Sequence, residues 1–253
     1  MSGTILVTGG TGTLGRAVVA RLREAGAETR VLSRKPGPDR VVGDLDTGAG
    51  LDEAVRGVAV VVHAATRHGH DVAGTERLVA ALRRTAPRAH LLYVSIVGVD
   101  RVPLPYYREK LAVEEVVRGS AAPWTIQRIT QFHTLLDAVF AALARLPLMP
   151  VLAGTDVQPI DVGDAAARVA ALALDPPGGR APDLAGPQVR PMADFAAAWL
   201  AARGKRRRLL PVRLPGRIAR GYRDGGHLAP EHADGTVTFE DFLAARPDRT
   251  RPR

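Results

Sequence analysis

Apolar and polar positions follow two periodicities along the first half of the chain. Short segments that suit strands occur at 4–8, 28–33, 41–42, 58–63, 91–95 and 124–127, and the run at 58–63 is continuous, as is typical of a strand buried on both faces of a parallel sheet. Between them, apolar residues recur on one helical face at 14–25, 51–56, 74–84 and 106–117. This alternation predicts an α/β fold with a Rossmann-type doubly wound parallel sheet.

The pattern loosens beyond about residue 130. Alanine-rich helices are expected at 132–146, 162–174 and 192–203, with proline and glycine clusters between them. We therefore predict a single structural unit with two parts: a sheet domain over 1–130, and a small, mostly helical C-terminal lobe over 131–253 that is partly interleaved with it. Open α/β folds bind ligands at the carboxyl ends of the strands, so the lobe is expected to pack there.

A glycine-rich turn joins the first strand to the first helix and reads Thr8-Gly9-Gly10-Thr11-Gly12-Thr13-Leu14-Gly15. Gly9 suits the tight turn, Gly12 lets the backbone approach a pyrophosphate, and Gly15 lets the helix pack closely on the strand. The helix N-terminus then offers N–H groups and a positive dipole to the phosphates. The strand–turn–helix context favours a dinucleotide site over a purely structural loop, with Thr11, Thr13 and Leu14 in its lining.

The end of the second strand indicates which dinucleotide is bound. An NAD site usually has an acidic residue about 20 residues after the glycines, whereas this chain has Ser33-Arg34-Lys35. Because Arg34 can bind a 2′-phosphate in fork geometry, we expect NADP(H), with NAD(H) less favoured. The alternatives are an Arg34 that is simply exposed charge, or a site that accepts both cofactors. Asp44 and Leu45 are expected beside the adenine, although Asp44 could instead cap its own loop.

These motifs resemble those of the short-chain dehydrogenase/reductase superfamily and, within it, the atypical NmrA-like, NAD(P)H-binding branch. The resemblance covers roughly residues 3–175 and rests on the glycine turn and on segments 43–45, 63–65, 93–95, 106–114, 127–132 and 158–166. It implies that Ala64, Ala65 and Thr66 line the path from adenosine to nicotinamide. It also implies that Ile129 and Phe132 lie close to the nicotinamide ring.

The same resemblance suggests a catalytic pair, Tyr106 and Lys110, which are four residues apart and so share one helix face. In reducing members such a tyrosine donates a proton, and the lysine holds the ribose and lowers the tyrosine pKa. Only three of the 35 basic residues are lysines, so a lysine here indicates that a compact ammonium is needed. Val97 stands where those members have a serine. Ser95 therefore either replaces that serine or only bonds the backbone, and Tyr106 could instead be a surface or core residue.

Three further polar residues, Gln131, His133 and Tyr222, are candidates for positions near a substrate. His133 follows the segment expected beside the nicotinamide and could supply a proton if Tyr106 does not. A single histidine on an alanine- and leucine-rich helix is more often a packed residue, which is the reading we favour.

Composition excludes several chemistries. The chain has no cysteine, so disulfides, thiolate nucleophiles and cysteine metal sites are ruled out, and the histidines at 63, 68 and 70 lack a carboxylate pattern that would complete a metal site. The N-terminal apolar run is too short for a signal peptide, and no stretch approaches the roughly 20 apolar residues of a membrane span. We therefore expect a soluble, cytoplasmic monomer with no membrane partner.

The net charge is +9, and nine basic residues lie between 203 and 223 without an intervening acid. This tract could bind nucleic acid or another polyanion. Pro211, Pro215 and Gly216 would break a long basic helix, and no nucleic-acid motif accompanies the charge. We therefore favour an exposed basic surface and do not expect a nucleic-acid partner.

Two functional hypotheses lead. The first is an NADPH-dependent, ketoreductase-like oxidoreductase, with 1–130 binding NADP(H) and 131–253 binding the substrate, which transfers hydride to a carbonyl, quinone or enone of a small, mainly apolar molecule. Natural-product tailoring is one setting for such a reaction. The second is a non-catalytic NADP(H)-binding redox sensor of the NmrA type, which the missing serine motivates.

Overall fold

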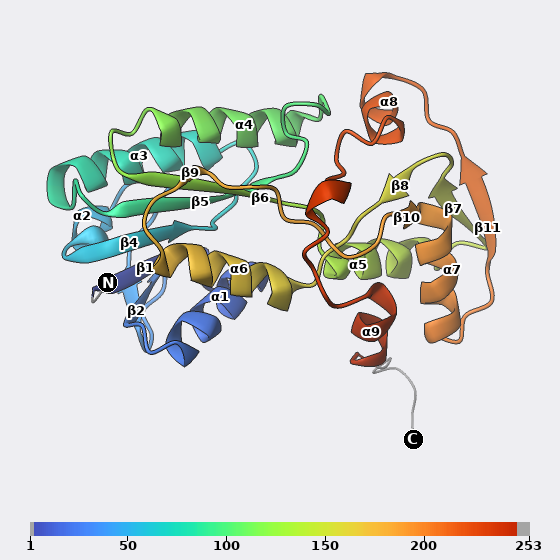
Figure 1. The fold of residues 1–253 in the computed structure, drawn as a ribbon, viewed down its shortest axis with the longest axis horizontal. Coiled ribbons are helices and arrows are strands. Elements are labelled where there is room, and N and C mark those ends of the chain that lie inside the picture. The colour runs from blue at the N-terminus through green and yellow to red at the C-terminus, as the bar shows by residue number, and fades with distance from the viewer. Residues whose placement is uncertain (1–2, 247–253) are drawn as a thin grey trace.

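A parallel seven-stranded sheet forms the centre of the molecule in the computed structural model, which describes residues 3–246 (Figure 1). Its strands lie in the order β3-β2-β1-β4-β5-β6-β9. Their bounds are Thr4–Thr8 (β1), Thr29–Ser33 (β2), Arg40–Val42 (β3), Val58–His63 (β4), His90–Ile96 (β5), Trp124–Ile129 (β6) and Gly179–Arg180 (β9). The strand order reverses beside β1, as in doubly wound sheets, so the predicted fold class is confirmed.

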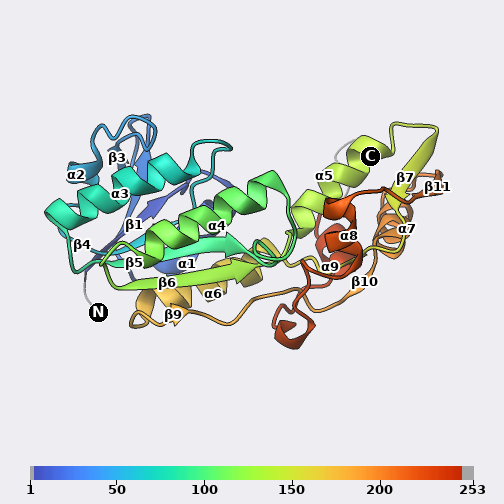
Figure 2. The ribbon, with the colours of Figure 1, turned by 90° about the horizontal axis from the view of Figure 1, so that it is seen from above.

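Helices cover both faces of this sheet (Figures 1 and 2). One face carries α1 (Thr13–Glu24) and α6 (Val162–Leu174). The other carries α2 (Leu51–Val55), α3 (Asp71–Thr85) and α4 (Pro105–Arg118). Each layer has its own apolar core, with Val18 and Val169 in the first and Leu78 and Val113 in the second, all fully buried. Because β4 is buried on both faces, its unbroken apolar run agrees with its position.

The chain leaves the sheet after β6 and later returns to it. The segments between are α5 (His133–Leu143), β7 (Leu148–Leu152) and β8 (Asp156–Val157), after which α6 packs against α1 and β9 adds a strand beside β6. The chain then forms β10 (Arg190–Pro191), α7 (Met192–Ala202), β11 (Arg208–Val212), α8 (Arg217–Arg223), the short 3-10 helix Pro230–His232 and α9 (Phe239–Ala244). The segments from α5 to β8 and from β10 to α9 together form the lobe at the right of Figure 1.

The lobe has its own aromatic core and more strand than its composition suggested. Phe140, Trp199 and Phe239 are buried together in this core. β7 pairs in parallel with β11, and β8 pairs in antiparallel with β10. None of these four strands was expected, because they are short, and all but β8 contain a proline, which weakens a strand pattern.

The basic tract extends from the end of α7 through β11 to α8 and does not form one helix. Its arginines at 206, 208, 213, 217 and 220 are exposed. Among the described helices, none combines the length and apolarity needed to cross a bilayer.

Candidate functional site

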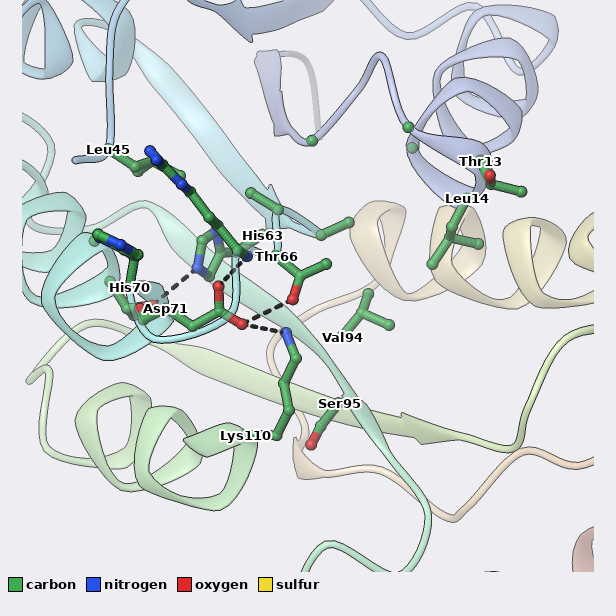
Figure 3. Close-up of a pocket in the computed structure, with 18 of the residues that line it drawn as sticks. Thr13, Leu14, Leu45, His63, Thr66, His70, Asp71, Val94, Ser95 and Lys110 are labelled. Carbon is green, nitrogen blue, oxygen red and sulfur yellow. Dashed lines mark hydrogen bonds and ion pairs between the residues drawn. The ribbon is translucent and has the colours of Figure 1, made fainter. Parts of the chain in front are cut away.

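A cleft of about 1280 Å³ runs along the carboxyl ends of the strands and continues toward the lobe (Figure 3). The residues proposed from the sequence for the cofactor site and for catalysis line it, except His133, the alternative proton donor. Those that line it are Gly9, Thr11, Gly12, Thr13, Leu14, Gly15, Ser33, Arg34, Asp44, Leu45, Ala64, Ala65, Thr66, Ser95, Tyr106, Lys110, Ile129 and Phe132. The fold therefore brings together segments that are far apart in the sequence.

The glycine turn is shaped by backbone contacts. Gly9 has a φ of +68°, and a Cβ there would lie 2.7 Å from both Ala64 O and Ala65 N. A Cβ on Gly15 would lie 2.2 Å from the carbonyl oxygen of Gly9. Neither position can accept a side chain without moving backbone. The start of α1 also has no side-chain cap and no acidic residue in its first turn, so its N–H groups face the cleft as a cradle suited to phosphate.

The end of the cleft at β2 and β3 is basic. Arg34, Lys35 and Arg40 line it, and Arg40 is a residue that the sequence analysis missed because it lies on a different strand. Nearby acids are engaged elsewhere: Asp39 pairs with Arg23 at 3.1 Å, and Asp44 accepts a 2.9 Å hydrogen bond from the Asp46 amide. Asp44 thus caps its loop through Oδ1 while still lining the cleft.

Lys110 is held by a buried ion pair that sequence spacing did not reveal. Its Nζ lies 2.9 Å from Oδ2 of Asp71 on α3, and both side chains are about 5% exposed (Figure 3). Thr66 Oγ1 donates to the same carboxylate oxygen at 2.8 Å, and the Arg67 amide donates to the other. Burial raises the pKa of Asp71, but Lys110 and these hydrogen bonds outweigh burial and hold that pKa below its ordinary value.

Tyr106 lies beside this ion pair. Its hydroxyl is 3.4 Å from Thr66 Oγ1, and Lys110 Nζ is 5.6 Å from its ring centre. The ammonium of Lys110 is therefore close enough to the Tyr106 ring to interact with it. The role of Tyr106 as the acid stays a prediction.

Ser95 has a different set of partners. Its hydroxyl donates a 2.6 Å hydrogen bond to Oε1 of Glu114, a fully buried carboxylate that Arg128 also binds. Figure 3 shows the Ser95 hydroxyl and the Lys110 ammonium in different places along the cleft wall. The serine is therefore part of a polar network that lies behind the wall of the cleft. A part for it in proton transfer stays a prediction, and no contact in the described structure supports one.

His63, at the end of β4, is locked between two threonines. Its Nδ1 lies 2.7 Å from Thr8 Oγ1 and its Nε2 lies 3.0 Å from Thr75 Oγ1. Burial, helped by the charge of Lys110, lowers the pKa of His63 to about 4. The imidazole is thus neutral near pH 7 and positions the loop that follows β4.

Stability is expected to fall as the pH drops from about 6.5 to about 4. Burial lowers the pKa values of His63, His90 and His227 to about 4, so the unfolded chain binds more protons than the folded one in this window. Each histidine contributes a slope of up to about 1.4 kcal/mol per pH unit in the free energy of unfolding. Urea unfolding at pH 7.5, 6 and 5 measures it. His90→Gln should reduce the dependence of the free energy of unfolding on pH, whereas substitution of the exposed His68 by Gln should not. Equal pH dependence in wild type and both variants would contradict the lowered pKa of His90.

Three residues at the lobe end of the cleft form a second polar group. Gln131 Nε2 lies 3.1 Å from the hydroxyl of Tyr107, and the Tyr222 hydroxyl lies 3.5 Å from it. Gln131 and Tyr222 were candidates from the sequence, but Tyr107 was not, because the spacing signal selects Tyr106. His133 is absent from the cleft lining: it bonds Val237 O at 3.0 Å and lies among the lobe aromatics. The suggestion that it supplies a proton is therefore wrong.

No group of three or more histidine and carboxylate side chains within residues 3–246 is arranged to hold a metal ion.

The sheet order, the glycine turn and the cleft at the strand ends define the class: this is a Rossmann-type α/β protein. Residues 1–178 match the family described as NmrA-like, and the chain belongs to the NmrA-like family. This confirms the resemblance drawn from the motifs.

Curated relatives are named as reductases. A "(4-alkanoyl-5-oxo-2,5-dihydrofuran-3-yl)methyl phosphate reductase" of Streptomyces griseus is 33% identical over 198 residues, covering 73% of this chain and 68% of the relative. A "Ceramide reductase" of Caulobacter vibrioides is 31% identical over 196 residues, covering 69% of this chain and 62% of the relative.

Solved structures agree on the fold. An NADPH-dependent quinone oxidoreductase of Escherichia coli, complexed with NADPH, superposes with a TM-score of 0.83 at 19% identity and covers 95% of this chain and 99% of its own. The triphenylmethane reductase of Citrobacter sp., complexed with NADP(H), has a TM-score of 0.79 at 18% identity, with 96% and 99% coverage.

Proposed function

We propose that this protein is an NADPH-dependent reductase that transfers hydride to a carbonyl, quinone or enone of a small, mainly apolar molecule. The observation that carries the proposal is the single cleft, which joins a phosphate cradle, a basic end and a lysine–tyrosine pair. The reductase names of the two curated relatives support it. Val94, Ile96, Leu104 and Leu135 line the cleft near these groups and suit an apolar substrate.

The residues present fit the cofactor, because the glycine turn lines the cleft and the first turn of α1 carries neither a side-chain cap nor an acidic residue that would repel a diphosphate. The amides that open α1 bind the phosphates, Arg34 and Arg40 bind the 2′-phosphate, and Lys110 binds the ribose next to the nicotinamide. When bound, NADPH supplies the hydride. In this arrangement the domain of residues 1–130 carries most cofactor contacts, and the lobe within 131–253 closes the substrate end.

Side chains of the protein itself donate the proton and stabilise the charge that remains. As hydride reaches the substrate carbon, negative charge develops on the oxygen, and Tyr106 donates its hydroxyl proton to that oxygen. Lys110 stabilises the tyrosinate that forms, and Asp71 holds the ammonium in place. Thr66, within 3.4 Å of the Tyr106 hydroxyl, orients it.

The direct test is NADPH oxidation, followed at its absorbance maximum, with a panel of ketones, quinones and enones. The reductase function is supported if NADPH is oxidised with at least one of these compound classes and the reduced compound forms in an equal amount. The second candidate, a redox sensor, is favoured by one observation: Ser95 is bound to Glu114 and Val97 stands at the second serine position. Equal affinity for NADPH and NADP⁺, with no turnover on the whole panel, would establish the sensor instead.

Reversing the charge at Arg34 should change the cofactor preference. In Arg34→Asp the charge-assisted bonds to the 2′-phosphate are lost and a carboxylate repels it, so we expect the dissociation constant for NADPH to rise about 10- to 100-fold. The dissociation constant for NADH should stay unchanged or fall. Arg21→Asp on the exposed face of α1, outside the cleft lining, is the matched control. Fluorescence titration measures both constants, and an unchanged NADPH affinity would remove Arg34 from the site.

A further inference from the structure

We propose that Tyr107, Gln131 and Tyr222 form a subsite for a second oxygen function of the substrate. The preferred substrates are then carbonyl compounds that carry an ester, amide or lactone carbonyl within a few bonds of the carbonyl to be reduced. This inference rests on the proposed reductase function and names its substrate class.

The three side chains converge from three separate segments. Tyr107 lies on α4, Gln131 follows β6, and Tyr222 lies on α8 in the lobe. All three line the cleft, and Tyr107 is only 3% exposed. The Tyr107 and Tyr222 ring centres are 6.4 Å apart, and the Tyr222 ring packs on His227 at 4.6 Å. The group is therefore built jointly by the sheet half and the lobe, at the end of the cleft away from the basic cofactor end.

Its hydrogen bonds are incomplete. The Tyr107 hydroxyl accepts from Gln131 Nε2 at 3.1 Å and shares one contact of 3.5 Å with the Tyr222 hydroxyl, so one of the two hydroxyl hydrogens is left without an acceptor within residues 3–246. Gln131 Oε1 is buried and also has no partner among the described residues. Buried polar atoms without partners are costly and uncommon, and these side chains line the cleft, so the unsatisfied hydrogen and Gln131 Oε1 point to a polar ligand.

The chemistry of the free groups selects the ligand. Burial raises the pKa of Tyr107 well above its ordinary value, so its hydroxyl stays a neutral donor near pH 7. A neutral donor suits a carbonyl oxygen, and the adjacent Gln131 Oε1 suits an amide N–H where the second function is an amide. The apolar side chains of Leu104, Phe132 and Leu135 nearby suit an alkyl chain.

The neighbouring tyrosine sets the spacing of the two substrate oxygens. Tyr106 lies on the Lys110 side of α4, whereas Tyr107 lies on the side of Gln131 and Tyr222. Their ring centres are 6.3 Å apart. Because the two rings are neighbours and both line the cleft, one substrate can place its reducible oxygen at Tyr106 and a second oxygen at Tyr107.

The test compares two ketones that differ only in the second carbonyl, methyl 3-oxodecanoate and 1-methoxydecan-3-one, with wild type, Tyr107→Phe, Gln131→Leu and Tyr106→Phe. The readout is the ratio of kcat/KM for the ester to kcat/KM for the methoxyketone. We expect Tyr107→Phe to lower this ratio about tenfold, the value of one hydrogen bond, and Tyr106→Phe to lower both constants by the same factor. Gln131→Leu removes only the bond that orients the Tyr107 hydroxyl, so it should lower the ratio by less than Tyr107→Phe does. A general structural defect would also lower both equally, so an unchanged ratio in Tyr107→Phe overturns the subsite.

A binding measurement separates this inference from the reductase function itself. Methyl hexyl malonate has two ester carbonyls and no ketone to reduce, and calorimetry with the NADP⁺-loaded protein gives its dissociation constant. About tenfold weaker binding in Tyr107→Phe than in wild type supports the subsite even if neither ketone is turned over. Equal binding overturns it. Failure of wild type to oxidise NADPH with either ketone counts against the reductase alone.

Discussion

Lys110→Ala is expected to lose reductase activity and stability together. Activity should fall by about 100-fold or more, because the ribose contact and the charge beside Tyr106 are both removed. The free energy of unfolding should fall by about 3–5 kcal/mol, because the buried Asp71 carboxylate is left without its cation. NADPH oxidation and urea unfolding measure the two effects.

A double variant separates these two consequences. Asp71→Asn/Lys110→Met removes both charges, so most of the lost stability should return while the activity stays low. Recovery of activity in the double variant would show that the lysine acts only through the fold. Full activity in Lys110→Ala would take it out of the mechanism altogether.

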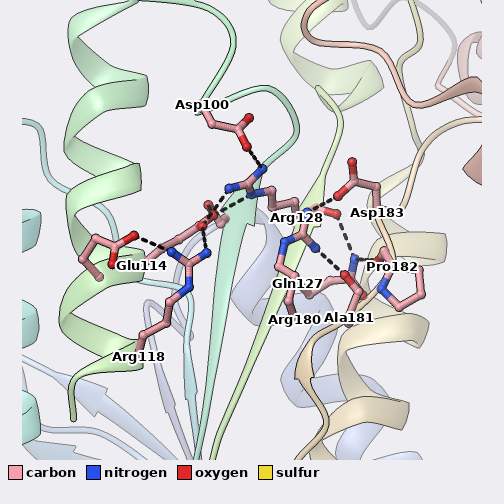
Figure 4. A network of polar contacts seen from close by, with 11 residues as sticks. Asp100, Glu114, Arg118, Gln127, Arg128, Arg180, Ala181, Pro182 and Asp183 are labelled. Atoms are coloured by element: carbon pink, nitrogen blue, oxygen red, sulfur yellow. Dashed lines mark hydrogen bonds and ion pairs between the residues drawn. The ribbon is translucent and has the colours of Figure 1, made fainter.

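Arg128→Met is expected to have the largest effect on stability outside the cleft (Figure 4). Arg128, on β6, binds both oxygens of Glu114 at 2.8 Å and also Asp100 at 2.7 Å, and Glu114 is fully buried. Burial lowers the pKa of Arg128, but Glu114 and Asp100 outweigh burial and raise it above its ordinary value. Removing this cation leaves the buried Glu114 carboxylate, at the junction of α4, β5 and β6, with only the partly exposed Arg118 as its cation, at a cost of about 3 kcal/mol or more.

The matched control is Arg118→Met, which removes another cation from the same carboxylate. Arg118 bonds Glu114 Oε2 at 2.9 Å, but its side chain is 33% exposed, so water can replace much of what it provides. We expect the free energy of unfolding of this variant to fall by about 1 kcal/mol or less. The midpoint of thermal unfolding should then fall by about 10 °C in Arg128→Met and by about 3 °C in Arg118→Met. Equal decreases would mean that burial of the network does not set its energy.

Prediction from sequence succeeded where neighbouring residues determine the structure. The glycine spacing at 9, 12 and 15 reflects one turn, in which backbone contacts exclude a Cβ at Gly9 and Gly15, so it is visible in eight consecutive residues. The run 58–63 and the alanine-rich segment 162–174 have the same bounds in the structure as in their patterns, because apolar periodicity follows burial directly. The pair at 106 and 110 was visible because four residues make about one helical turn.

Prediction failed where proline interrupted a short pattern or where partners are distant in the chain. β7 and β11 pair across 60 residues, and each contains a proline that hides its strand character. Two side-chain positions also depend on contacts that the spacing of neighbouring residues does not predict. Ser95 bonds Glu114, and His133 packs among the aromatic side chains of the lobe.

The sequence alone determined most of the sheet, the glycine turn, the basic residue after the second strand and the lysine that lines the cleft. Each of these follows from backbone limits or periodicity within a few residues. Only the tertiary structure decided that Asp71 holds Lys110, that Arg40 joins Arg34, and that Tyr107 meets Gln131 and Tyr222. Such contacts join segments up to 115 residues apart, and packing of whole elements, rather than local preference, brings their side chains together.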